Sequence, residues 1–152
     1  IILLSLFSFN AIGAGTSSST DNSNETSDQI ITLYELAEKH IDNQSYDKSL
    51  KLLKKLTKRE DLGTKRADIY NLLGFSYRKL ENPDLDKSFA AYMMAIEIDP
   101  SHLGAHEYLG ELYLMRDQKD KAVIILKKLD QLAGSNTEEY KELKIAIDAY
   151  QS

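Results

Sequence analysis

The chain contains no cysteine and few residues that interrupt a helix. Without cysteine among its 152 residues, it cannot have a disulfide framework, a thiolate nucleophile or a cysteine-based zinc site. Only two prolines and seven glycines occur, which is typical of a helical protein. Basic residues are outnumbered, 19 against 24 acidic ones, for a net charge of −5. Because nucleic acid binding needs clustered cations, this charge balance argues against a nucleic acid partner.

The first 28 residues differ in composition from the rest. Residues 1–14, IILLSLFSFNAIGA, are apolar and uncharged and end in small residues, which indicates a truncated secretory signal peptide. The apolar run is shorter than the ~20 residues that span a bilayer, and a shortened membrane anchor is the alternative. Residues 15–28 are rich in Ser, Thr and Asn and predict a disordered spacer. We therefore expect an exported protein, placed in the bacterial periplasm, with no stable membrane insertion after signal cleavage.

A repeated arrangement of Leu, Gly and Tyr follows the spacer. Apolar residues from residue 28 onward recur at three- and four-residue spacing, which predicts amphipathic helices. Two stretches match at an offset of 109 − 73 = 36: Leu73-Gly74 with Tyr77, and Leu109-Gly110 with Tyr113. Each is followed by a small and then a large residue, Ser88 with Tyr92 and Ala122 with Leu126, and a weaker copy begins at Leu33. The arrangement resembles the tetratricopeptide repeat (TPR), whose consensus is W-x2-L-G-x2-Y, A-x3-F and P over about 34 residues.

The resemblance implies an all-α fold, a short right-handed α-solenoid of three TPR helix-turn-helix units plus a C-terminal capping helix. It places the three units within residues 29–133, at about 29–63, 67–102 and 103–133, and the capping helix at 137–152. We expect seven helices, at residues 29–42, 46–58, 66–81, 84–98, 102–116, 119–132 and 137–150. The stretches GAHEYLGELYL and EEYKELKIAIDAY are also similar to those of small exported bacterial TPR proteins.

Glycine inside a helix needs an explanation, because it is less favourable there than alanine by roughly 0.5–1 kcal/mol. The resemblance implies that each unit is a pair of antiparallel helices packed at close range. A glycine at the crossing lets the helices approach, and the added dispersion contacts offset its helical penalty. We expect Gly74 to face Ser88 and Gly110 to face Ala122 across these crossings.

Three histidines are the only side chains suited to acid–base chemistry at neutral pH. His40 and His106 occupy repeat positions where the family has Tyr and Trp, so their expected role is packing. His102 and His106 are four residues apart and could face one metal ion. We expect Ser101 to cap that helix instead, leaving His102 exposed while His106 turns inward. We predict no enzyme, no catalytic residue, no metal site and no cofactor.

In TPR arrays the first helices of the units line a concave groove that binds a partner. Carried over to this sequence, the resemblance implies the following groove residues: Tyr34, Glu38, Ile41, Asn71, Phe75, Arg78, Glu107, Glu111, Leu114 and Met115. Some family members grip a peptide carboxylate with basic residues, but Glu107 and Glu111 occupy such positions here and would repel it. We therefore expect a partner protein or peptide with apolar and basic residues.

The predicted function is a non-catalytic protein-interaction adaptor that binds a partner segment in the concave groove. Two alternatives stay open from the sequence. One is a structural TPR protein that self-associates through an open end of the solenoid as a homodimer. The other is a weak metal or small-ligand carrier that uses His102 and His106.

Overall fold

The structure is a computed structural model, and it describes residues 20–151, with side chains from residue 27 onward. Within this range the chain forms seven α-helices and no strand, as predicted. The helices are α1 (Thr20–Asp42), α2 (Tyr46–Leu56), α3 (Lys65–Arg78), α4 (Leu85–Ile98), α5 (Leu103–Met115), α6 (Lys119–Ala133) and α7 (Glu138–Ala149). The fold is therefore the predicted all-α solenoid.

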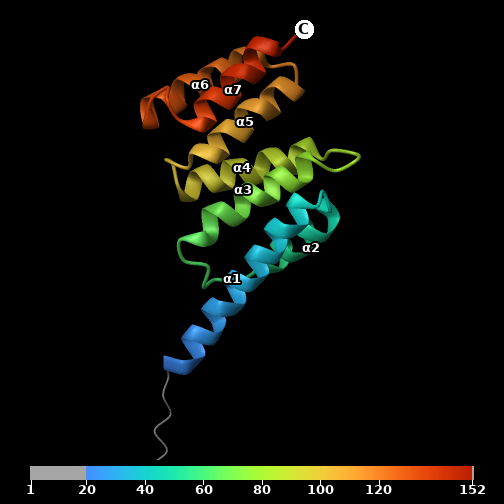
Figure 1. The fold of residues 1–152 in the computed structure, drawn as a ribbon, viewed down its shortest axis with the longest axis vertical. Helices are drawn as coiled ribbons and strands as arrows, with labels where there is room; N and C mark the ends of the chain where they lie inside the picture. Colours follow the sequence, from blue (N-terminus) through green and yellow to red (C-terminus); the bar gives the residue numbers. More distant parts are fainter. Residues whose placement is uncertain (1–19, 152) are drawn as a thin grey trace, which may run out of the picture.

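The helices stack along the long axis of the molecule, from α1 at one end to α7 at the other (Figure 1). Successive helices pack in pairs, α1 with α2, α3 with α4 and α5 with α6, which we call units one, two and three. Helix α7 packs against both α5 and α6 and so covers the last unit. None of the described helices has the length and apolar character needed to cross a membrane.

The first helix begins earlier than the sequence analysis predicted. Helix α1 begins at Thr20 and not near residue 29, so residues 20–28 of the predicted disordered spacer are helical. No glycine or proline interrupts this stretch, and extending an existing helix is far easier than nucleating one. The predicted signal peptide at 1–14 and the rest of the spacer lie outside the described residues.

The apolar residues that the helical spacing predicts to be internal form three core clusters along the stack. On α2, Leu50, Leu53 and Leu56 recur every three residues, share one face and are buried in the first cluster, under α1 and α3. Burying each such side chain contributes about 1.5–3 kcal/mol. A second cluster joins α4 to α5 through Tyr92 and Leu109. The third cluster joins unit three to α7, so that every helix contributes to one of the three clusters.

Gly74 and Gly110, the glycines of the two Leu-Gly-Tyr stretches, differ in how they match the predicted crossings. The Ser88 hydroxyl donates a hydrogen bond to the Gly74 carbonyl (2.8 Å), and a Cβ at Gly74 would lie 2.6 Å from the Tyr92 ring. At Gly110 the predicted partner Ala122 does not supply the closest atoms. The nearest atoms to a Cβ there belong to Leu143 of α7, at 2.5 Å.

The different neighbour of Gly110 accompanies a difference in residue size between the units. Where unit two has Tyr92, whose ring fills the space beside Gly74, unit three has the shorter Leu126. Beside Gly110 the space is occupied by Leu143 from the next helix.

The start of α5 also differs from the prediction, because His102 and not Ser101 is its N-cap. His102 Nδ1 accepts a hydrogen bond from the Ala105 backbone N–H (3.1 Å). A nitrogen that accepts carries no proton in the neutral ring, so Nε2 holds the hydrogen and donates it to Asp68 Oδ1 of α3 (3.2 Å). The His102 side chain is 13% exposed. One imidazole thus caps α5 and ties it to the preceding unit.

Candidate partner-binding groove

Three aromatic side chains from successive units form a row across the middle of the stack. The Phe75 ring on α3 lies 6.2 Å from the ring of Tyr46, at the start of α2, and 5.1 Å from the ring of Tyr108 on α5. Their edge-on and tilted arrangements are the favourable ones for aromatic pairs. All three rings are half-buried, so each keeps part of its surface available. We call Tyr46, Phe75 and Tyr108 the aromatic row.

Arg78 lies beneath this row as an internal brace. Its guanidinium carbon is 5.5 Å from the centre of the Phe75 ring and 5.2 Å from that of Tyr108. Its Nη1 is ion-paired with Glu111 Oε2, and its Nε donates to the Tyr92 hydroxyl (3.3 Å). Arg78 is only 6% exposed, so the sequence-based expectation that it lines an open groove was wrong. It neutralises Glu111 and joins α3, α4 and α5.

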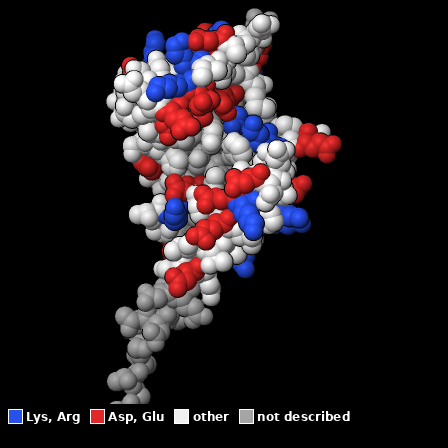
Figure 2. Space-filling view, in the orientation of Figure 1, with Lys and Arg blue, Asp and Glu red and all other residues white. Residues whose placement is uncertain are grey.

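An acidic pocket of about 380 Å³ lies beside the row, between α5 and α7. It is lined by Gly104, Glu107, Tyr108, Glu138, Glu139 and Glu142, and Tyr108 therefore belongs to both features. Figure 2 shows acidic side chains gathered over this end of the molecule. No ion pair to a described Lys, Arg or His is formed by any of the four glutamates. The pocket thus presents uncompensated negative charge.

Glu107 is the most perturbed group in the acidic pocket. Burial, followed by the carboxylates of Glu111, Glu139 and Glu142, raises its pKa to about 8, while Arg78 opposes the shift. Desolvation and nearby like charges both disfavour the ionised form of a carboxyl group. At neutral pH Glu107 is therefore mainly protonated, and the pocket is less negative than its composition indicates.

Several predicted groove residues are buried in the array itself. The four with less than a tenth of their surface exposed are Tyr34 (8%), Asn71 (8%), Arg78 (6%) and Leu114 (9%). Tyr34 belongs to the first core cluster, with the Lys65 ammonium 4.6 Å from its ring centre, and Leu114 belongs to the third. The expectation that Tyr34 and Leu114 offer apolar surface to a partner was wrong, because neighbouring helices already cover them.

The remaining predicted residues keep some exposed surface. Glu38 and Ile41 are half-buried on α1, whereas Met115 is exposed at the end of α5. By contrast, the buried Asn71 has no hydrogen-bond partner for its Oδ1 among the described residues. Its amide nitrogen lies 3.3 Å from where a Cβ on Gly104 would be. The structure therefore brings Phe75, Glu107 and Glu111 into one region and leaves the α1 residues apart from it.

Five residues of the site were not predicted from the sequence. They are Tyr46 on α2, Tyr108 on α5 and the three glutamates at the start of α7. The signal for α7 was present, because Leu143 follows Leu109 by 143 − 109 = 34 residues. Helix α7 thus continues the register of the first helices, and its glutamates lie against α5.

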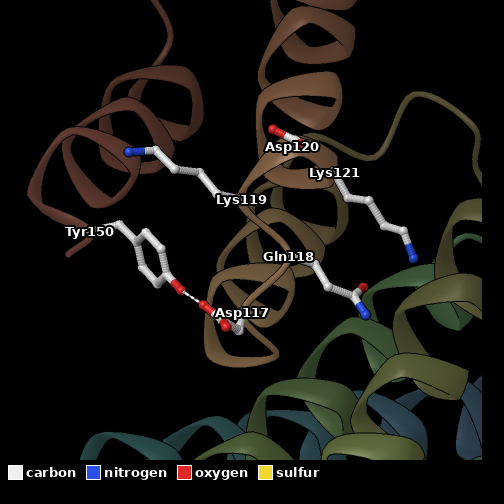
Figure 3. A pocket seen from close by; sticks show the side chains of 6 residues that line it. All are labelled: Asp117, Gln118, Lys119, Asp120, Lys121 and Tyr150. Atoms are coloured by element: carbon white, nitrogen blue, oxygen red, sulfur yellow. Dashed lines mark hydrogen bonds between the residues drawn. The ribbon is translucent and has the colours of Figure 1, made fainter. Parts of the chain in front are cut away.

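A second pocket, of about 410 Å³, lies at the turn between α5 and α6. It is lined by Asp117, Gln118, Lys119, Asp120, Lys121 and Tyr150 (Figure 3). The Tyr150 hydroxyl donates to the Asp117 carboxylate, and the side chains of Lys119 and Lys121 point in different directions. Charges of both signs that do not converge give this pocket no preference for one ligand charge.

The histidine pair offers no open metal site. Both ring nitrogens of His102 already have partners, and His106 is buried as predicted, with its Nε2 donating to the Pro100 carbonyl (3.0 Å). Across the described part of the chain, no group of three or more His, Asp or Glu side chains is arranged to hold a metal ion.

Comparison with known proteins supports the fold and goes no further. No protein-family model and no curated protein matches the chain. Solved structures do match. One is the crystal structure of MamA, a TPR helical solenoid protein, with a TM-score of 0.65 and 20% sequence identity. The match covers 85% of this chain and 72% of that one. The chain therefore has a TPR-like fold.

Proposed function

We propose that this protein is a non-catalytic interaction adaptor that binds a partner segment across the aromatic row and the acidic pocket. The observation that carries the proposal is their continuity, because Tyr108 belongs to both. Helical arrays use such surfaces for extended contacts, since each repeat adds an element to one face.

The chemistry of the two features defines the partner. Half-buried aromatic rings favour apolar side chains and also attract cations to their faces. The glutamates of the acidic pocket favour Lys or Arg over acidic side chains. Covering a ring such as that of Phe75 contributes about 1.5–3 kcal/mol, whereas an exposed ion pair contributes about 0–1 kcal/mol. The partner segment therefore carries an apolar anchor beside a basic residue, and the anchor supplies most of the affinity.

The test starts from partners captured by the parent chain and measures each affinity by calorimetry. Phe75→Ala is expected to weaken binding about tenfold or more at any salt concentration, because it removes apolar contact. Glu138→Lys with Glu142→Lys is expected to weaken binding mainly at low salt, where charges are least screened.

The matched control is Ile124→Ala, which removes an exposed apolar side chain from α6. It should leave the affinity unchanged. If the Phe75 and glutamate variants bind as tightly as this control, the partner binds elsewhere and the proposal is wrong.

Self-association is a second candidate, favoured by one observation on the outer helix of unit two. Met93, Met94 and Ile98 on α4 are all exposed. Sedimentation of the protein over a range of concentrations distinguishes this homodimer from the adaptor, which binds its partner as a monomer.

Export is proposed on residues 1–14 alone. Their apolar composition favours a bacterial signal peptide and a periplasmic protein. Fractionation of cells that express the chain with its own N-terminus tests this assignment.

A further inference from the structure

The joint between α5 and α7 combines a tight apolar contact with crowded carboxyl groups. Gly110 lets Leu143 approach the α5 backbone so closely that a Cβ would lie 2.5 Å away. Toward the start of both helices the same joint opens into the acidic pocket, where Glu107 lies opposite Glu139 and Glu142. The docking of α7 therefore depends on both apolar packing and the charge of these side chains.

The charged groups that face Glu107 come from three helices. Its own helix α5 supplies Glu111, α7 supplies Glu138, Glu139 and Glu142, and α3 supplies Arg78. Only Arg78 is positive, and it is already paired with Glu111. The net environment of Glu107 is therefore negative.

The lysines of α7 do not compensate for this charge. Lys141 Nζ donates to the Asn136 carbonyl (2.7 Å), and Lys144 Nζ pairs with Asp148 (2.5 Å). Carboxyl groups crowded without a counter-ion do not all ionise together, and the least solvated of them keeps its proton longest. That group is Glu107, whose pKa is about 8.

We propose that the joint between α5 and α7 is a proton-controlled latch, in which a proton on Glu107 keeps the C-terminal helix docked and loss of that proton loosens it. The latch is independent of any partner. When α7 leaves, the apolar residues that it covers on unit three, including Leu114 and Leu129, become accessible.

The direction of the effect follows from proton linkage. In the docked state Glu107 has a pKa of about 8, and departure of α7 lowers this pKa toward the ordinary value of 4.5, because burial decreases and the Glu139 and Glu142 carboxylates move away. The docked state therefore binds the proton more tightly. The stabilisation of the docked state by this proton is complete below about pH 4.5, the ordinary pKa of a glutamate. The advantage is lost as the pH rises from about 4.5 to about 8.

Hydrogen–deuterium exchange on the whole chain tests the latch. Protection factors, corrected for the intrinsic pH dependence of exchange, are measured for α7 and α2 at about pH 6 and about pH 9. We expect the protection of α7 to fall about tenfold or more at the higher pH, while that of α2 stays constant. Equal protection of α7 at both values would overturn the proposal.

Three variants assign the effect to the carboxyl cluster. Glu107→Gln keeps the shape of a neutral Glu107, so α7 should stay protected at both pH values. Glu139→Gln removes one like charge and should move the midpoint of the protection change to lower pH. Glu35→Gln, an exposed carboxyl on α1, is the matched control and should behave as the parent. If Glu107→Gln or Glu139→Gln shows the same pH dependence as the control, the latch is not at this joint.

Discussion

The surroundings of Gly74 and Gly110 differ although both glycines follow a leucine at the same place in their repeats. Beside Gly74 the space is filled from within unit two by the Tyr92 ring, which also hydrogen-bonds Arg78. Beside Gly110 the space is filled by Leu143, from the helix that follows unit three. The first junction is therefore closed by a hydrogen-bonded ring and the second by a flexible side chain.

The two junctions also differ in the charge around them. On α5, Glu111 is paired with Arg78, whereas Glu107, one turn earlier, is surrounded by carboxyl groups. The repeat thus preserves the helix arrangement while leaving each junction free to differ in chemistry. In the middle of the array Arg78 neutralises Glu111, whereas the C-terminal end is acidic and, as we propose, responsive to pH.

Removing the brace of the middle junction should have the largest effect on stability. Arg78→Ala leaves Glu111 without its counter-ion and removes the cation between two aromatic rings. We expect a loss of about 2–4 kcal/mol in the free energy of unfolding, measured by chemical denaturation. The control is Arg116→Ala, whose partner Asp86 is almost fully exposed, so the loss should stay below about 1 kcal/mol. Equal losses would show that the Arg78 pair is no stronger than a surface pair.

Adding a methyl group to each glycine compares the two junctions directly. Gly74→Ala places a Cβ 2.6 Å from the Tyr92 ring, which cannot move without losing its bond to Arg78, and should destabilise the protein by about 1–3 kcal/mol. Gly110→Ala meets the methyl ends of Leu143, which can change rotamer. Alanine favours a helix by about 1 kcal/mol at both positions, so this gain cancels in the comparison, and the loss for Gly110→Ala should be the smaller of the two. Equal melting temperatures for both variants would contradict the difference between the junctions.

The two glutamates on α5 should respond with opposite signs when each is replaced by glutamine. Glu107→Gln removes a carboxyl group that resists ionisation, so it should stabilise the protein by about 1–2 kcal/mol near pH 8 and by nothing near pH 4. Glu111→Gln removes the partner of Arg78 and should destabilise the protein near pH 8. Chemical denaturation of both variants and the parent at about pH 8 and about pH 4 measures these changes in the free energy of unfolding. If both variants changed the free energy of unfolding in the same direction near pH 8, the proposed charge difference between the junctions would be wrong.

The sequence predicted the helices well because each one has a strong internal signal. The Leu-Gly-Tyr stretches located α3 and α5, and the three-residue spacing of leucines located α2. The start of α1 was not predictable from its Ser- and Asn-rich composition, because helix propagation from the apolar part overrides weak local preference.

The site was less predictable, because repeat register places a residue on a helix but does not identify its tertiary partner. Leu143, from the helix after unit three, is the closest neighbour of Gly110, whereas the closest neighbour of Gly74 is Tyr92 from its own unit. Arg78 is buried because Tyr92 and Glu111, each distant in sequence, converge on it. Each outcome depends on the size or charge of a residue in another helix, which the local pattern does not contain.

The bridging imidazole of His102 has a consequence for how the array unfolds. A repeat protein behaves as a one-dimensional chain of elements, whose cooperativity depends on the coupling energy between neighbours. His102 caps the start of α5 and contacts Asp68 of α3. Fraying of α5 from its start therefore also breaks a contact to α3. This shared side chain therefore adds to the coupling between units two and three and opposes their separate unfolding.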